Sequence, residues 1–424
     1  MGISRITSWL LVILLLPAAG CHRYLVATPN LLRHADGREV YAACPADCRK
    51  TEAEVLYATD RTVELVGVAG KRPVYGHGRS TSLAFGVAIV SLTPHSSWKE
   101  LVQDSTTENR SREYQLKLAG TKEVGRLKPL LEQAQLSESG LEITRVMLQE
   151  RDEQRQRLHE LLSQRLAQTA HKDVYIFIRG VNNSFDDAVF RTAEVWHFMG
   201  RVGVPVAYSW PAGLGGIRGY AYDRESGEFT VTHLRRFLKT VAECPGVERV
   251  HLVAHSRGCD VTITALRELN LAYRAQGKST QHELKLENLV LAAPDVDEEV
   301  FIQRFVGENL LQAARRTTIY ASQHDKTIEA ADLIFASRRR LGMLAGKDIN
   351  LRIRHGLARL PNVQFIECKV SGFWMSHNYA FTHPATLSDL ILVLRDRRDP
   401  WAANGRPLSQ PTEGTWELTD DYLK

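Results

Sequence analysis

The sequence predicts an α/β protein whose core is a doubly wound, mostly parallel sheet. Between about residues 172 and 396, short apolar runs alternate with helical stretches. These runs are apolar on both faces, as expected of parallel strands that are covered by helices on each side. Strands separated by helical connectors form right-handed βαβ units, and several such units build a doubly wound sheet. The six runs are 174–178, 204–210, 250–254, 286–294, 317–322 and 363–370.

Composition is consistent with a globular chain. Of the 424 residues, 44% are hydrophobic, 24% charged and 8% aromatic, which excludes a wholly disordered, a collagen-like or a polytopic membrane protein. Lys and Arg number 54 against 49 Asp and Glu. A net charge of +5 over this length is mild, so we expect no nucleic-acid partner.

Residues 1–20 have the pattern of an export signal. Arg5 precedes an unbroken apolar run, Trp9 to Leu16, which is far shorter than the ~20 residues that span a bilayer. The small residues before Cys21 resemble the lipobox of bacterial lipoproteins, although Ala18 stands where that motif usually has Leu. The resemblance implies a lipid-anchored Cys21 in the cell envelope. Because His22, not Asp, follows the Cys, it further implies the outer membrane, facing the periplasm. A secreted protein and a short N-terminal anchor are the alternatives.

Cysteine use fits an exported chain. Cys44 and Cys48 in the segment CPADC are close enough for a local disulfide in an oxidising compartment. Cys244, Cys259 and Cys368 lie in or beside apolar segments and are expected to be buried thiols. Neither an HExxH motif nor a paired CxxC is present, so we expect no metal site.

The segments that flank the core have different characters. Residues 21–52 are interpreted as a polar linker, and 53–171 as an extension with strands in 54–92 and helix over 120–170. The helix has an apolar stripe that favours packing on the body, with a partner helix as the alternative. After the last strand we expect a helix at 384–396 and an extended tail over 397–424. The stripe consists of Leu158, Leu161, Leu162 and Leu166.

The segment 250–266, VHLVAHSRGCDVTITAL, carries the main signal for chemistry. An apolar strand runs into Ala254-His255-Ser256-Arg257-Gly258, and a helix follows, which is the strand–turn–helix context of a nucleophilic serine. Small residues are needed two positions before and after the Ser because larger side chains would clash with the neighbouring strand and helix. The helix N-terminus favours negative charge at the hydroxyl. The alternative is an ordinary helix-capping Ser.

With these strands and this turn in place, the chain from about residue 54 resembles a bacterial family of α/β-hydrolases that belong to the esterase/lipase superfamily and have no assigned function. The resemblance implies an α/β-hydrolase core at 172–396 and a nucleophile–acid–histidine triad. It implies no particular substrate. The matching segments, in order, are LYATDR (56–61), RGVNNSFDDA (179–188), YSWPAG (208–213), YDRESGE (222–228), LVAHSRG (252–258), LAAPDVD (291–297), YASQHD (320–325) and SHNYA (376–380).

Chain order indicates the acid and the base, because in this fold the Ser is followed by the acid and then by the His. The acid usually follows the second strand after the nucleophile strand, where Asp325 stands; Asp295 and Asp297 are the rivals. The base should follow the last strand, where His377 matches the family's SHNY motif and His383 is the alternative. His377 would take the Ser proton, and Asp325 would stabilise the imidazole tautomer and its cation. The sequence gives His255 and His324 no role beyond surface or packing.

The oxyanion hole departs from the family pattern. One donor should be the backbone N–H of Arg257, and the second that of Val181 or Asn182 in the loop after the first core strand. Many relatives have His-Gly at that loop, and this chain has Arg179-Gly180. Losing one such donor costs roughly 2.7–4 kcal/mol.

The two arginines next to the expected site have several interpretations. Arg179, with Asn182, is a candidate substrate-binding residue, and with Arg257 it would favour a carboxylate or phosphate group near the site. Alternatively Arg179 pairs with Asp186 or Asp187, blocks the hole, or points to solvent.

We therefore expect a serine hydrolase of the bacterial envelope that cleaves carboxylic esters or lipid acyl groups without a cofactor. One alternative is a catalytically weak envelope protein that binds a partner or lipid, and another is a peptidase or amidase that uses the same triad. The sequence points to no particular protein partner.

Overall fold

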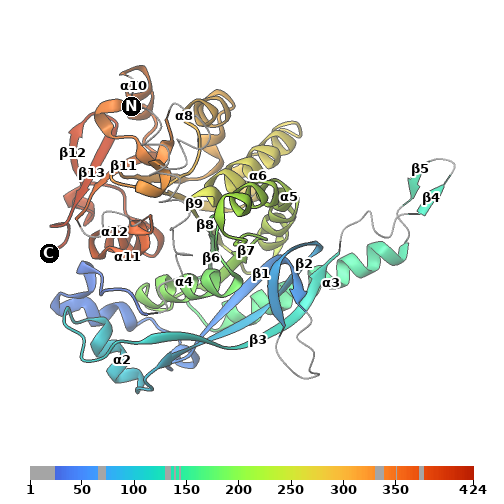
Figure 1. The fold of residues 1–424 in the computed structure, drawn as a ribbon, viewed down its shortest axis with the longest axis horizontal. Helices are drawn as coiled ribbons and strands as arrows, with labels where there is room; N and C mark the ends of the chain where they lie inside the picture. Colours follow the sequence, from blue (N-terminus) through green and yellow to red (C-terminus); the bar gives the residue numbers. More distant parts are fainter. Residues whose placement is uncertain are drawn as a thin grey trace.

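The computed structural model describes residues 24–64, 73–128, 135–137, 140–142, 145–329, 339–349, 351–371 and 377–424. Its centre is an eleven-stranded sheet with the strand order β12-β13-β11-β10-β9-β8-β6-β7-β1-β2-β3 (Figure 1). The strands are β1 (Ala53–Glu64), β2 (Val74–Thr93), β3 (Gln115–Leu127), β6 (Asp173–Ile178), β7 (Val204–Ser209), β8 (Arg249–His255), β9 (Leu286–Ala292), β10 (Arg316–Ala321), β11 (Val363–Lys369), β12 (Ser409–Thr412) and β13 (Thr415–Thr419). A separate hairpin pairs β4 (Gln135–Ser137) with β5 (Gly140–Glu142).

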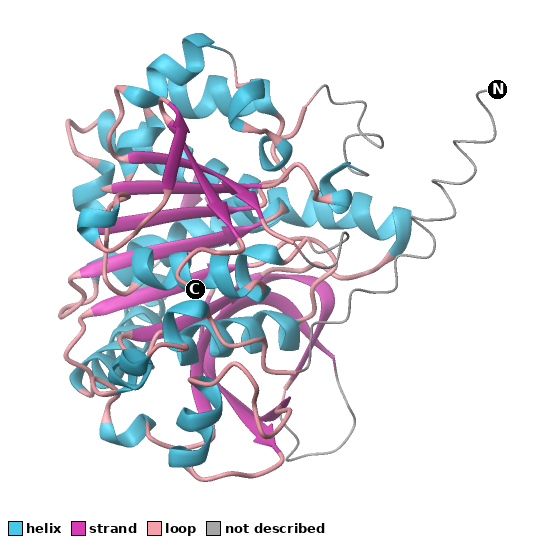
Figure 2. Ribbon diagram, turned by 90° about the vertical axis from the view of Figure 1, so that its left-hand side faces the viewer, coloured by secondary structure: helices cyan, strands magenta, loops and turns pink. Residues whose placement is uncertain are grey.

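The six core strands confirm the predicted doubly wound sheet. β7, β6, β8, β9, β10 and β11 are hydrogen-bonded side by side and all parallel. Helices cover both faces of the sheet (Figure 2). The described helices are α2 (Trp98–Ser105), α3 (Arg145–Ala167), α4 (Phe185–Phe198), α5 (Gly216–Glu243), α6 (Arg257–Arg274), α7 (Thr280–Glu283), α8 (Glu298–Phe301), α10 (Leu351–Ala358), α11 (Tyr379–Thr382) and α12 (Pro384–Leu394).

Two apolar clusters lie on opposite faces of the sheet, and each core strand contributes side chains to both because successive side chains point to opposite faces. In β8, Leu252 and Ala254 pack with the α5 and α6 side, whereas Val253 packs with the α4 and α12 side. In β6, Ile176 belongs to the first cluster and Phe177 to the second. This burial on both faces is the physical reason why the core strands are continuously apolar in the sequence.

The chain reverses its direction of winding at β6. From β6 it passes through α4 to β7 on one side, and then through α5 to β8 on the other side of β6. At such a switch point the loops after two neighbouring strands turn away from each other, which leaves a crevice at the carboxyl ends of the strands. The loops after β6 and β8 carry the predicted oxyanion and nucleophile segments, so the topology brings them together.

The extension at 53–171 continues the same sheet. β1 pairs in parallel with β7, and β2 and β3 follow as a long antiparallel ribbon. The expected helix over 120–170 is wrong in its first part, because β3 runs to Leu127 and α3 begins only at Arg145. Figure 1 shows that the amino-terminal part of α3, next to β4 and β5, projects from the body. The four leucines of its predicted stripe lie in its carboxy-terminal half and are all buried, which confirms that this half packs on the body.

The segments interpreted as linker and tail also differ from expectation. Residues 24–52 lie against the body, where Leu32 is fully buried and the side-chain amide of Asn30 donates to the carbonyl of Tyr422. Residues 409–419 form β12 and β13, and β13 adds in parallel to β11. The long-range pairings that recruit these two polar segments cannot be read from local periodicity.

Cys44 and Cys48 are both free thiols in the structure, so the expected local disulfide is absent from it. Cys48 is the last residue of a short 3-10 helix, Ala46–Cys48, and Cys44 precedes this helix, where its thiol contacts the Pro45 carbonyl. Cys244, Cys259 and Cys368 are buried, as predicted. Burial raises the pKa of the Cys44 thiol to about 11.

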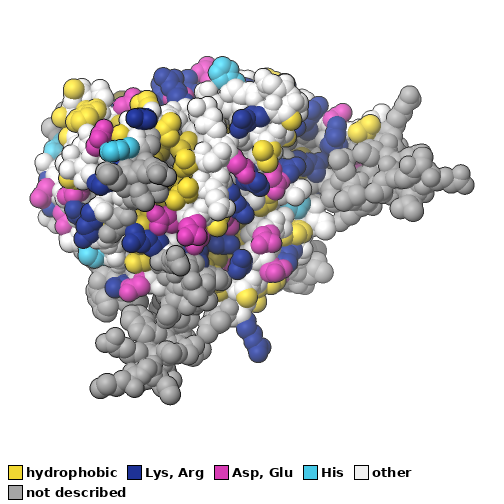
Figure 3. All heavy atoms as spheres, turned by 90° about the horizontal axis from the view of Figure 1, so that it is seen from above, with side chains coloured by type: hydrophobic (Ala, Val, Ile, Leu, Met, Phe, Trp, Pro, Cys, Tyr) yellow, Lys and Arg dark blue, Asp and Glu magenta, His cyan; other side chains and the backbone are white. Residues whose placement is uncertain are grey.

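The distribution of charge on the surface and the apolar character of the helices can be compared with the expectations for nucleic acid and membrane. Basic and acidic side chains are interspersed on the face drawn in Figure 3, in keeping with the low net charge. Within the described ranges, no helix combines the length and apolar character that crossing a bilayer requires. The predicted signal segment and Cys21 lie outside the described residues.

Candidate active site

Ser256 occupies a sharp turn between β8 and α6. Its backbone has φ 57° and ψ −129°, a conformation that residues with a side chain rarely adopt, and its hydroxyl caps no helix N–H. By contrast, Ser97 and Ser184 have φ near −75° and accept capping hydrogen bonds. The structure therefore excludes the interpretation of Ser256 as an ordinary N-cap.

Close packing around this turn explains its small residues. A Cβ atom at Gly258 would lie 2.5 Å from the carbonyl oxygen of Arg179, and one at Gly180 would lie 2.6 Å from the Cβ of Ser256. Both contacts are too short for any side chain to fit without movement of the backbone. Ala254, fully buried, stands where a first glycine is usual. The serine is thus pressed against the loop after β6.

Asp325 lies after β10 and is almost fully buried. One carboxylate oxygen, Oδ1, accepts hydrogen bonds from the backbone N–H groups of Thr327 and Ile328, at 3.1 and 3.2 Å. The other, Oδ2, lies 2.7 Å from Nδ1 of His377. The two backbone donors fix the carboxylate so that its second oxygen faces the imidazole.

His377 lies after β11, at the same edge of the sheet as Ser256. Because Asp325 accepts at Nδ1, the imidazole carries its hydrogen there and presents a bare Nε2. That Nε2 atom is buried and has no hydrogen-bond partner among the described residues, and it is not bonded to the Ser256 hydroxyl. Catalytic hydrogen bonds are often long in structures without substrate. Ser376, which precedes it in the SHNY motif, lies outside the described residues.

The rival acids and the rival base have other partners. Asp295 accepts from the hydroxyl of Tyr220 at 2.6 Å and from the guanidinium of Arg340 at 2.8 Å. Asp297 caps the N-terminus of α8 through two backbone N–H groups. His383 lies 3.1 Å from Asp420 near the C-terminus. The structure therefore pairs only Asp325 with the candidate base.

The loop after β6 contains two candidate oxyanion donors, the backbone N–H groups of Val181 and Asn182, and only one of them is free of a hydrogen bond in the described part of the chain. The N–H of Asn182 donates to the Asp223 carboxylate at 2.8 Å, so this group is already used. The Val181 N–H donates no hydrogen bond within the described part of the chain. On the other side, Arg257 is the first residue of α6, where backbone N–H groups have no partner within the helix. The geometry thus leaves the N–H groups of Val181 and Arg257 as donors.

Both arginine side chains have partners within the chain. The guanidinium of Arg179 is buried and contacts Asn183 through Nε and Nη2, at 3.2 and 3.1 Å, and Asn378 through Nη2 at 3.0 Å. Arg257 turns along α6 to Asp260, at 3.1 Å. Arg179 therefore joins the loop after β6 to the loop after β11.

The sequence interpretation missed His255, which was expected only to pack. Its ring lies 4.6 Å from the His377 ring, and its Nε2 is 2.9 Å from the His377 carbonyl oxygen. Burial lowers the pKa of His255 well below its usual value, and Arg179 and His377 act in the same direction. The only signal in the sequence was its position next to the nucleophile.

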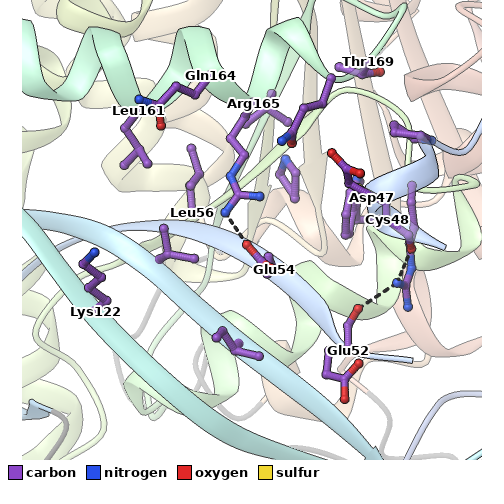
Figure 4. Close-up of a pocket in the computed structure, with 18 of the residues that line it drawn as sticks. Asp47, Cys48, Glu52, Glu54, Leu56, Lys122, Leu161, Gln164, Arg165 and Thr169 are labelled. Carbon is purple, nitrogen blue, oxygen red and sulfur yellow. Dashed lines mark hydrogen bonds and ion pairs between the residues drawn. The ribbon is translucent and has the colours of Figure 1, made fainter. Parts of the chain in front are cut away.

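Two cavities border this region, and a third lies apart from it. One of about 830 Å³ is lined by Ser322, Asp325 and Asn378, and one of about 600 Å³ by Arg257 and Arg340. The third, about 840 Å³, lies under α3 and shares no residue with the triad (Figure 4). Leu56 and Leu161 line it together with the ion pair of Arg165 and Glu54. The candidate site is therefore identified by its side-chain geometry and not by the volume of a cavity.

The described ranges contain no group of three or more His, Cys, Asp or Glu side chains that is arranged to hold a metal ion. The candidate site consists instead of a serine, an imidazole, a carboxylate and backbone N–H groups. These are the components of nucleophilic acyl transfer, in which the imidazole accepts the serine proton and the N–H groups stabilise the oxyanion.

The match to a family model agrees with this fold. A family model described as "Alpha/beta hydrolase of unknown function (DUF900)" matches residues 154–397. A solved structure of a lipase-esterase related protein from Clostridium acetobutylicum ATCC 824 aligns at 9% identity and a TM-score of 0.23, over 54% of this chain and 90% of that one. No curated protein matches. Because the family match covers more than half of the sequence and includes every residue of the candidate site, the chain belongs to this family of α/β-hydrolases of unknown function.

Proposed function

We propose that the protein is a serine hydrolase that cleaves carboxylic esters, including lipid acyl esters, through an acyl-enzyme. The observation that carries the proposal is the Asp325–His377 hydrogen bond at the sheet edge where Ser256 has its strained backbone. An imidazole with an anchored Nδ1–H and a bare Nε2 is suited to accept a proton from a nearby hydroxyl.

The proposed reaction has two steps. In the first, the Ser256 oxygen attacks the ester carbonyl while His377 takes the hydroxyl proton, and the N–H groups of Arg257 and Val181 stabilise the oxyanion. His377 then gives the proton to the departing alcohol, which leaves an acyl-serine. In the second step, a water molecule gives a proton to His377 and attacks the acyl carbonyl. The bond between the acyl carbon and the Ser256 oxygen then breaks, the carboxylic acid leaves, and His377 returns the proton to Ser256. No cofactor enters this sequence.

The alternative of a catalytically weak binding protein was motivated by Arg179. The contacts of its guanidinium with Asn183 and Asn378 favour a role within the loops over one that blocks the hole. A peptidase or amidase would use the same residues, and the choice depends on the leaving group. Short esters are the least demanding substrates for such a triad, and they therefore provide the first test.

The test uses the full chain in detergent, with a fluorophosphonate probe and short p-nitrophenyl esters. We expect labelling and turnover in the wild type, and loss of both in Ser256→Ala. Ser97→Ala serves as the matched control, because Ser97 also precedes a helix but has relaxed geometry. An unlabelled, well-folded wild type would refute the proposed function and favour the binding protein.

We also propose that the enzyme is attached to the bacterial envelope through a lipid on Cys21, and that its substrate is reached from the periplasmic side. The support is the signal pattern of residues 1–20. Metabolic labelling with a palmitate analogue should mark the wild type and not Cys21→Ala. Labelling that persists in the variant, or none in either, would contradict the anchor.

A further inference from the structure

We propose that His255 and Arg179 form a clamp that positions His377, an inference that rests on the proposed function of that histidine. The clamp holds the segment His377–Phe381, called here the base loop, from two sides. One side is the end of the nucleophile strand β8, and the other is the loop after β6. Neither residue touches a reacting atom, so both are positioning residues.

His255 holds the first residue of the base loop. A carbonyl oxygen only accepts hydrogen bonds, so the 2.9 Å contact shows that Nε2 of His255 carries the hydrogen and donates it to the His377 carbonyl. The other ring nitrogen, Nδ1, is buried without a hydrogen-bond partner among the described residues. The centres of the His255 and His377 rings are 4.6 Å apart, and the rings are tilted by 46°. The Phe381 ring also packs against His255, with 5.4 Å between the ring centres. One side chain thus contacts both the backbone and the ring of the candidate base.

A neutral His255 is suited to this place. Burial keeps its pKa well below its usual value, with the nearby Arg179 and His377 adding to the effect. During acyl transfer His377 carries a positive charge, and a charged neighbour at ring-contact distance would oppose that charge. His255 supplies a hydrogen bond without adding a second cation.

Arg179 connects the base loop to the oxyanion segment. Its Nη2 donates to Asn378 Oδ1 at 3.0 Å, and its Nε and Nη2 donate to Asn183 Oδ1. The Asn183 amide in turn donates to the Val181 carbonyl at 2.6 Å. The guanidinium also lies over the Phe381 ring, 5.7 Å from its centre. The Arg179 side chain therefore links the base loop to the segment that carries the Val181 N–H.

The experiment compares substitutions that retain or remove the donor at position 255 in the full-length protein. His255→Phe keeps a ring but has no donor, whereas His255→Gln keeps an N–H close to the place of Nε2. We expect kcat to fall about 10- to 100-fold in His255→Phe, because small displacements of a catalytic group are costly, while KM stays within about 2-fold. His255→Gln should remain within about 3-fold of the wild type. His251→Phe, a buried histidine on the same strand but remote from the base loop, should leave kcat unchanged.

Arg179 is tested through its coupling to Asn378. If the two act through their hydrogen bond, the double variant Arg179→Gln/Asn378→Ala should lower kcat no further than the more damaging single variant. Fully additive losses would overturn this half of the clamp. Equal losses in His255→Phe and His255→Gln, or no loss in a folded His255→Phe, would overturn the other half.

A second readout separates the clamp from the hydrolase proposal. The amide N–H groups of Phe381, Thr382 and His383 are bonded within the base loop and its first turn, and they exchange with solvent only when it opens. We expect faster hydrogen–deuterium exchange there in His255→Phe and Arg179→Gln, and not in His255→Gln or His251→Phe. Unchanged exchange in the first two variants would overturn the clamp. If the wild type neither labels nor turns over, the hydrolase proposal fails while this readout still decides the clamp.

Discussion

Two buried aspartate–histidine pairs lie at opposite ends of the parallel strands. At the amino ends, Asp173 on β6 accepts from Nε2 of His251 on β8, at 2.9 Å. At the carboxyl ends, Asp325 contacts Nδ1 of His377 at 2.7 Å. The difference lies in the second ring nitrogen. His251 Nδ1 is bonded to the Asn288 amide at 2.8 Å, whereas His377 Nε2 has no partner among the described residues.

This difference separates a structural pair from a candidate catalytic one. A histidine whose two nitrogens are both hydrogen-bonded has no atom left to accept a proton from a substrate or a serine. Asp173 is further held by the guanidinium of Arg249 at 2.6 Å, and the Tyr175 ring stacks on His251. The same two residue types thus contribute to folding at one end and leave a reactive nitrogen at the other. Four predictions test this contrast, beginning with the largest expected effect.

The largest effect is expected at Ser256. Ser256→Gly should lower kcat by about 10⁶-fold. It should also raise the free energy of unfolding by about 1 kcal/mol, because glycine adopts a positive φ without strain. Ser256→Ala should lose the same activity without gaining stability. Ester turnover and denaturant unfolding measure the two effects, and equal stability of the two variants would show that the turn stores no such strain.

The second prediction concerns the acid of the catalytic pair. Asp325→Asn should lower kcat by about 10⁴-fold, since an amide cannot hold the imidazole tautomer or stabilise its cation. Asp295→Asn is the control, because Asp295 is equally buried but bonded to Tyr220 and Arg340. Its kcat per folded molecule should change less than about 10-fold. A larger fall in kcat for Asp295→Asn than for Asp325→Asn would assign the role of the acid to Asp295.

The third prediction concerns the other pair. Asp173→Asn should lower the free energy of unfolding by about 2–4 kcal/mol, because it removes the carboxylate that accepts from Arg249 and from the buried His251, and kcat should not change. Burial acts to raise the pKa of Asp173, but the hydrogen bonds from His251 and Arg249 outweigh it and hold the pKa well below its usual value. Such a group stabilises the fold above about pH 4, and this contribution is lost as the pH falls further. The free energy of unfolding of the variant should therefore depend less on pH below about pH 4 than that of the wild type. The same pH dependence in both proteins would contradict a stabilising role for the Asp173 carboxylate.

Another buried carboxylate, Asp60 on β1, has neither a histidine nor a cation hydrogen-bonded to it in the described part of the chain. Burial raises its pKa to about 7. With a raised pKa, its contribution to stability is full below about pH 4 and is lost as the pH rises through 7. Relative to Asp60→Asn, the wild type should lose roughly 1 kcal/mol of unfolding free energy per pH unit between these values. Parallel pH profiles of the two proteins would show that Asp60 titrates normally.

Local patterns in the sequence predicted the core well. All six apolar runs became neighbouring parallel strands, and the turn at Ser256 was expected because Gly258 and Ala254 flank it. Chain order was enough to bring Asp325 and His377 forward as candidates. Such inferences succeed because a strand that is buried on both faces, and a tight turn, both constrain residue type at fixed spacing.

Other features could not be predicted because they depend on distant contacts. The role expected for Arg179 changed once Asn378, 199 positions later in the chain, was seen to accept its hydrogen bond. His255 looked like a packing residue until the His377 carbonyl was placed beside it. In the same way, the 24–52 segment and the C-terminal strands found their partners across the fold.

The sequence by itself therefore determined the strand pattern, the winding of the core and the residue types at the nucleophile turn. Those follow from local sterics and from burial, which act on neighbouring residues. Only the tertiary structure decided which of two buried aspartates meets the candidate base, which backbone N–H groups remain available, and which histidine keeps a bare nitrogen. In each case the alternatives are groups of the same chemical type. They differ in which partner lies within hydrogen-bond distance, and the folded chain sets those distances.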